Sequence, residues 1–114
     1  MEISYSTAPC DLGRVLLAGT AKGVSAIYLG DSDARLEAAL RREYPAAVIR
    51  KNASGVSQWL GELVRHISGQ QPQLDLPLDV QATAFQRRVW EALQAIPPGT
   101  TQTYTGLARS LGLA

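Results

Sequence analysis

The stretch TAFQRRVWEALQAIPPGTTQTYTGLARSLG, residues 83–112, decides how the C-terminal part of this 114-residue chain folds. Thr83 is a favoured helix N-cap, and Gln86 three residues later completes a capping box. An apolar stripe at helical spacing follows, formed by Phe85, Val89, Leu93 and Ile96. The pattern therefore predicts a helix over residues 85–96.

The second half of the stretch predicts another helix. Pro97, Pro98 and Gly99 end the first one, because proline cannot continue the backbone hydrogen-bond ladder. Thr103 can cap a helix over residues 104–111, whose apolar face is formed by Tyr104, Leu107, Ala108 and Leu111. The stretch thus reads as two short helices joined by a Pro-Pro-Gly turn.

This helix pair resembles the O6-alkylguanine-DNA alkyltransferases, in particular the branch formed by the C-terminal half of Ada and its stand-alone bacterial relatives. The resemblance is carried by Phe85, Val89, Trp90, Leu93, Ile96-Pro97, Gly99, Thr103-Tyr104 and Leu107-Ala108. It implies DNA repair by a methyltransferase that moves an alkyl group from O6 of guanine in double-stranded DNA to its own cysteine, without a cofactor. It also implies that the two helices open a helix-turn-helix DNA-binding domain.

The resemblance implies which residues meet DNA. The family's tyrosine at the position of Tyr104 contacts the phosphate 3′ to the target guanine and helps to turn that nucleotide out of the stack. Thr103 and Arg109 are further candidates for phosphate contacts. The alternatives stay open: Tyr104 can pack against Leu107 and Ala108, and Thr103 can act simply as a cap.

No catalytic residue is assigned, because the family's Pro-Cys-His-Arg acceptor motif does not occur in these residues. The only cysteine, Cys10, follows a proline, but Asp11 and Leu12 stand where the motif has His and Arg. A neighbouring carboxylate disfavours the nucleophilic thiolate, so Cys10 is interpreted as structural. We expect a chain that is truncated before the acceptor and inactive in alkyl transfer as it stands.

The only histidine, His66, has no second histidine or cysteine at metal-ligand spacing, so no metal site is predicted. It is interpreted as structural or exposed at a helix end. Two other functions remain open beside a truncated alkyltransferase. One is a non-catalytic alkyltransferase-like lesion sensor, and the other is a protein-interaction module. A homodimer through the C-terminal helices is expected, because their apolar stripes would otherwise stay partly uncovered.

The preceding residues alternate strand and helix patterns. Three strands joined by short turns predict an antiparallel meander, with Val24, Ala26 and Tyr28 on one face of the third strand. Pro9 is expected to end the first strand. The predicted elements are strands 2–8, 14–18 and 24–29, a helix from Asp33 to Pro45, a short strand 48–51, a helix 54–68 and an extended segment 76–80.

The predicted fold class is α+β. Residues 1–80 are expected to form a ribonuclease-H-like domain, an antiparallel sheet with helices on one face. Residues 81–114 are expected to form an incomplete helical DNA-binding domain.

Composition adds little beyond a globular class. The net charge is +1 and the hydrophobic fraction is 46%, and no apolar run is long enough to span a bilayer. The N-terminus has no secretory-signal pattern and one cysteine allows no internal disulfide, so a cytoplasmic location is expected. After Thr83, the arginines Arg87, Arg88 and Arg109 outnumber Glu91, a weak footprint for nucleic acid.

Overall fold

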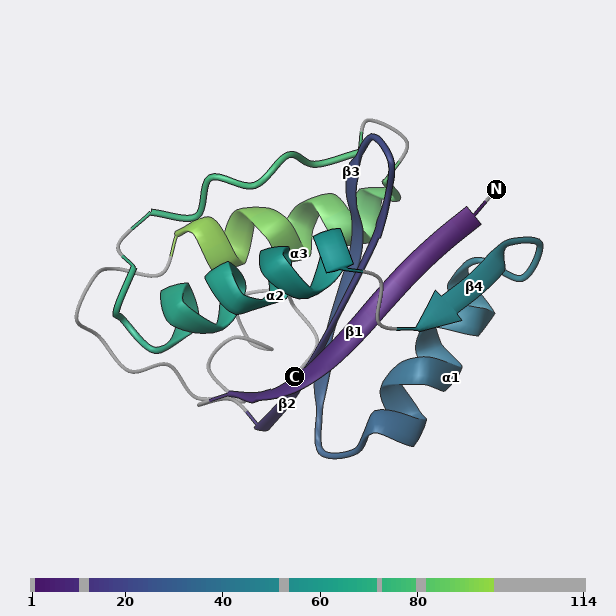
Figure 1. Ribbon diagram of the computed structural model, residues 1–114, viewed down its shortest axis with the longest axis horizontal. Helices are drawn as coiled ribbons and strands as arrows, with labels where there is room; N and C mark the ends of the chain where they lie inside the picture. The colour runs from purple at the N-terminus through teal and green to yellow at the C-terminus, as the bar shows by residue number, and fades with distance from the viewer. Residues whose placement is uncertain (1, 11–12, 52–53, 72, 80–81, 96–114) are drawn as a thin grey trace.

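A mixed four-stranded sheet organises the molecule (Figure 1). The computed structural model describes residues 2–10, 13–51, 54–71, 73–79 and 82–95. β1 (Glu2–Cys10), β2 (Gly13–Thr20) and β3 (Gly23–Gly30) form the predicted antiparallel meander. β4 (Val48–Lys51) pairs in parallel with β1, which gives the order β3-β2-β1-β4. The α+β class is confirmed, whereas the expectation of an entirely antiparallel sheet is wrong.

The parallel pairing of β4 follows from the helix that precedes it. α1 (Asp33–Glu43) carries the chain from β3 at one edge of the sheet to β4 at the other. A crossover of this kind makes the second strand run in the same direction as the first. Because β3 and β1 are both antiparallel to β2, β4 is also parallel to β1.

The ends of β1 and α1 follow local chemistry. Pro9 does not end β1: it pairs with Arg14, at an end of the strand that β4 does not reach, so its missing N–H costs no ladder bond on that side. α1 begins after Ser32, whose Oγ accepts from the Arg35 N–H at 3.3 Å. Asp33 in the first turn binds Arg14, and that hydrogen bond holds the pKa of the Asp33 carboxyl below its usual range.

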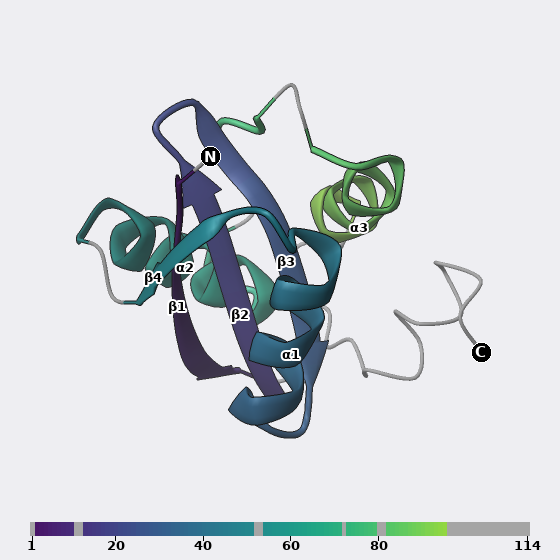
Figure 2. The same ribbon diagram turned by 90° about the vertical axis from the view of Figure 1, so that its right-hand side faces the viewer.

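Helices cover both faces of the sheet, which corrects the expectation of helices on one face (Figure 2). α1 packs on one face, and α2 (Ser54–Ile67) and α3 (Ala84–Gln94) pack on the other. The reason lies in β2, where Val15–Ala18 is a continuous apolar run and every member is buried. Successive strand residues point to opposite faces, so such a run needs cover on both.

A β-bulge in β3 moves Val24 to the other face. The register shifts so that Gly19 pairs with Val24 while Ala18 pairs with Ala26, leaving Ser25 as the extra residue. Val24 therefore joins Ile27 in the cluster under α2 and α3, and Ala26 stays on the α1 face. The sequence-based placement of Val24 beside Ala26 is wrong for this reason.

The extended segment before α3 covers the free edge of β3. Val24 N–H donates to Pro77 O at 2.7 Å, and Asp79 N–H donates to Val24 O at 2.8 Å. Gly23 makes this approach feasible, because its φ is +145° and a Cβ there would lie 2.7 Å from Pro77 O. The predicted extended conformation is confirmed for Leu76–Asp79, and it leads the chain along the sheet toward α3.

Candidate nucleic-acid interface

The N-terminal end of α3 is fastened to the sheet and to α1. Thr83 is its N-cap as predicted, accepting at Oγ1 from the Gln86 N–H at 3.2 Å. The Gln86 side chain does not complete a capping box. Its Oε1 accepts from the Ile27 N–H at 2.8 Å, and its Nε2 donates to Glu43 Oε1 at 2.9 Å. Gln86 is buried, and an unpaired Ile27 N–H beside it would be more costly than the absence of a second cap contact.

Glu43, the last residue of α1, is the centre of this polar network. Its carboxylate accepts from Gln86 Nε2, from the Tyr28 hydroxyl and from Thr83 Oγ1, the last at 2.9 Å. Burial, reinforced by the bond to Glu43, raises the pKa of the Tyr28 phenol. Hydrogen bonds to an ionised acceptor are about twice as strong as neutral ones, so β3, α1 and α3 are held together at one point.

The C-terminal end of α3 is fastened by α2 and the loop after it. His66 is only 2% exposed, with Nε2 2.7 Å from Leu93 O and Nδ1 2.9 Å from Gln71 O. Gln94 Nε2 also donates to Leu74 O at 3.3 Å. Of the two sequence-based interpretations of His66, the structural one is confirmed and the exposed one is wrong.

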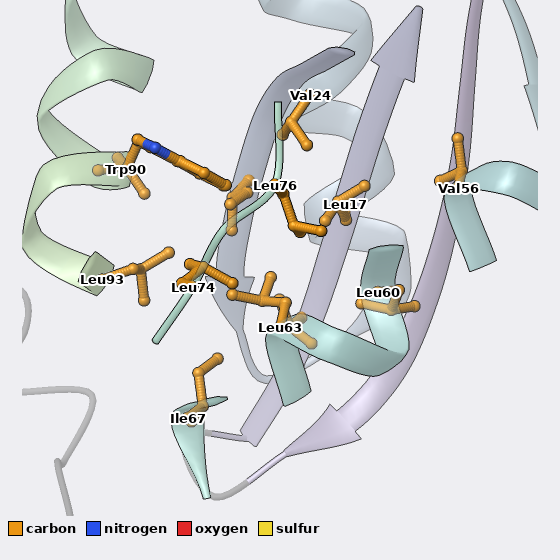
Figure 3. Close-up of a cluster of buried hydrophobic side chains, with 13 residues drawn as sticks. Leu17, Val24, Val56, Leu60, Leu63, Ile67, Leu74, Leu76, Trp90 and Leu93 are labelled. Atoms are coloured by element: carbon orange, nitrogen blue, oxygen red, sulfur yellow. The ribbon is translucent and has the colours of Figure 1, made fainter. Parts of the chain in front are cut away.

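Apolar packing joins the two fastened ends of α3 (Figure 3). Val89, Trp90 and Leu93 lie in the same buried cluster as Leu63 and Ile67 of α2. Trp90 is buried in this core, and Phe85 is half-buried against the same cluster. Val89 and Leu93 of the predicted stripe are buried within their own chain and Phe85 is half-buried, so the described part of α3 gives no support to a homodimer. Ile96 and the expected second helix, 104–111, lie outside the described residues.

The outward face of α3 carries exposed charged side chains. Arg87, Arg88 and Glu91 are exposed. The Arg88 guanidinium lies 5.9 Å from the centre of the Phe85 ring. Next to it is a shallow hollow of about 400 Å³, lined by Tyr28, Ala39, Arg42, Glu43, Phe85 and Gln86. Guanidinium groups on an exposed helix face suit backbone phosphates, which fix a protein's register on a duplex.

The predicted contact residues Tyr104, Thr103 and Arg109 lie outside the described residues. Cys10 is half-buried at the end of β1 and packs against the larger core cluster, a position that agrees with its structural interpretation. Among the residues described, no group of His, Cys, Asp and Glu side chains is arranged to hold a metal ion. No helix in those ranges is both long and apolar enough to cross a membrane.

Comparison with known proteins gives one consistent result. Residues 84–114 match a family model described as "6-O-methylguanine DNA methyltransferase, DNA binding domain". The chain is 39% identical over 112 residues to the bifunctional transcriptional activator/DNA repair enzyme Ada of Escherichia coli, covering 98% of this chain and 32% of that protein. It is 34% identical over 108 residues to the methylated-DNA–protein-cysteine methyltransferase of Methanosarcina barkeri, covering 95% of this chain and 64% of that one.

The solved structures agree on the fold. The crystal structure of Mycobacterium tuberculosis O6-methylguanine methyltransferase superposes with a TM-score of 0.51 at 24% identity, covering 96% of this chain and 62% of that chain. The 114 residues thus span between about a third and two thirds of the length of these relatives.

Proposed function

We propose, from the premise that this chain is a homologue of the O6-alkylguanine-DNA alkyltransferases, that it serves in the repair of O6-alkylated guanine in DNA. One observation carries the proposal: the match to the family's DNA-binding domain begins at Ala84, the first residue of α3. α3 is the helix that the sheet, α1 and α2 hold at both ends. The sheet domain therefore serves as a scaffold that orients the start of a DNA-binding unit.

The roles within that unit are assigned by the family resemblance. Tyr104 contacts the phosphate beside the lesion and helps to turn the damaged nucleotide out of the duplex. This step is needed because the alkyl group on O6 cannot be reached while the guanine base is stacked in the duplex. Thr103 and Arg109 add phosphate contacts. Arg87 and Arg88 add exposed guanidinium groups on α3. We place this activity in the cytoplasm.

The proposed contribution of these 114 residues is DNA binding rather than alkyl transfer. The printed sequence contains no Pro-Cys-His-Arg motif. Cys10, the single thiol, belongs to β1 and packs against the core. A thiolate nucleophile needs a positive or histidine-paired setting, and the residue after Cys10 is an aspartate.

A salt-dependent binding measurement tests the proposal. Fluorescence anisotropy with duplexes carrying guanine or O6-methylguanine should show weak binding to both. The logarithm of the binding constant should fall linearly with the logarithm of the salt concentration. Arg109→Ala should lower the affinity and reduce the salt slope by about one unit. Tyr104→Phe should weaken binding without changing the slope, since it removes a hydroxyl and no charge.

The matched control is Arg35→Ala, which removes an exposed arginine from α1, on the sheet face opposite α3. It should leave both affinity and slope unchanged. Equal losses in Arg35→Ala and Arg109→Ala would mean that binding is unspecific attraction by net charge. A strong preference for the modified duplex would show that these residues already read the lesion.

A further inference from the structure

His66 lies where the C-terminal ends of two helices meet. It occupies the last turn of α2, which ends at Ile67, and its ring touches the carbonyl of Leu93, the second-last residue of α3. The other ring nitrogen faces the carbonyl of Gln71 in the loop after α2. The side chain is fully enclosed. One buried ring thus bridges α2, its following loop and the end of α3.

The chemistry of this bridge depends on the protons of the ring. Both partners are carbonyl oxygens, which only accept hydrogen bonds. A neutral imidazole has one N–H and can donate to one of them, whereas an imidazolium donates to both. Each helix also presents the negative end of its dipole at its C-terminus, which favours a cation there. The arrangement is therefore complete only when the ring carries both protons.

Three ion pairs in the part of the chain that the structure describes, Arg14 with Asp33, Arg50 with Glu2 and Lys51 with Glu37, do not include the imidazole. Arg65 is a second basic side chain in the last turn of α2, but it is exposed. The ionisable side chains on the elements around His66 are Glu62 and Arg65 on α2, Asp75 after the loop, and Glu91 on α3. Arg65, Asp75 and Glu91 are exposed and Glu62 is half-buried.

We propose that His66 is a positioning residue that sets the C-terminal end of α3 by donating from both ring nitrogens, and that this hold loosens when the ring gives up one proton. The inference rests on the proposed function in one respect: α3 is the first helix of the DNA-binding match. It goes beyond that function because His66, a residue of α2, sets the position of the helix with which the DNA-binding match begins.

Nuclear magnetic resonance on the whole chain without DNA tests the proposal. The ring nitrogen shifts of His66 and the exchange protection of the last-turn amides of α3 are followed together from about pH 5 to pH 8. Protection should fall about tenfold as pH rises, with the same midpoint as the ring titration, because one charged hydrogen bond is lost. Protection that stays constant while the ring titrates would overturn the proposal.

Three variants separate positioning from general stability. His66→Gln keeps N–H donors at every pH, so the last turn of α3 should stay protected without pH dependence. His66→Phe leaves both carbonyls unpaired and should lose that protection throughout. Leu36→Ala opens a cavity under α1, on the opposite face of the sheet, and should lower global stability while leaving the pH dependence at α3 intact.

Two results would contradict the role of His66. One is a His66→Gln variant that keeps the wild-type pH dependence, and the other is a Leu36→Ala variant that loses it. If His66→Phe does not fold, the wild-type profile and His66→Gln still decide. Because these readouts contain no DNA, failure to bind duplex would count against the proposed function alone. Conversely, duplex binding in the wild type that does not follow the ring titration would count against the control of DNA-binding residues by His66.

Discussion

The two faces of the sheet are closed in different ways. On the α1 face, one helix adjacent in the chain covers a small cluster that includes Tyr5, and tyrosine hydroxyls reach polar partners at its rim. On the other face, aliphatic side chains and Trp90 form the larger cluster, and α2 covers it only together with α3. The larger core is thus shared with the helix that opens the DNA-binding match. Packing against the sheet consequently fixes the position of α3.

The largest expected effect concerns Trp90, which is 6% exposed in the larger core. Trp90→Ala should lower the free energy of unfolding by about 3–5 kcal/mol, since it removes a buried aromatic and leaves a cavity. Urea unfolding followed by circular dichroism measures it. Phe85→Ala is the control on the same helix and should cost clearly less, because Phe85 is only half-buried. A Trp90→Ala cost within about 0.5 kcal/mol, as for a surface substitution, would show that α3 is not part of that core.

A smaller effect is expected where the two faces are linked. Glu43→Ala removes the acceptor for Tyr28, Thr83 and Gln86 and should lower the unfolding free energy by about 2–3 kcal/mol, because three donors, one of them on buried Gln86, lose this carboxylate. Hydrogen exchange should show the loss in α3 as well as in β3. The matched control is Glu37→Ala, whose carboxylate binds Tyr5 and Lys51 on the α1 side alone. Exchange in α3 that rises equally in both variants would refute the link.

The smallest effect belongs to the α1 face and appears at alkaline pH. Burial, followed by the hydrogen bond to Glu37, raises the pKa of Tyr5 to about 12. An unfolded tyrosine ionises near pH 10, so the folded state retains its proton over that interval. This contribution to stability is present below about pH 10 and is lost as pH rises toward about 12.

Tyrosinate absorbance and urea unfolding over the same interval check this expectation. In Tyr5→Phe, the free energy of unfolding should fall less between about pH 10 and about pH 12 than in the wild type, because the Tyr5 contribution is absent. Phenylalanine fits the same site, so the fold should otherwise persist. A Tyr5 that ionises near pH 10 in the folded chain would mean that the α1 face is open to water, and the contrast between the faces would weaken.

Local patterns in the sequence determined most of the elements. The three strands of the meander, the helices near 33–45 and 54–68, the short strand 48–51 and the Thr83 cap are all present. Each depends on neighbours within a few residues: alternation, helical spacing, a capping side chain or a glycine in a turn. The resemblance read from the motif after Thr83 agrees with the family model that matches residues 84–114, because the residue pattern is local and specific. The residues predicted to touch DNA, Tyr104, Thr103 and Arg109, remain predictions.

Only the tertiary structure decided how these elements meet. The strand segment Val15–Ala18 is buried on both faces of the sheet, although the sequence predicted helices on one face alone. Which helix covers which face depends on the crossover through α1. One bulge residue, Ser25, reversed the face of Val24. Gln86 and His66 looked like a capping residue and an ordinary helix-end histidine, and both became bridges between distant elements. A buried polar group takes the partner that would otherwise stay unpaired, and that partner lies far away in the chain.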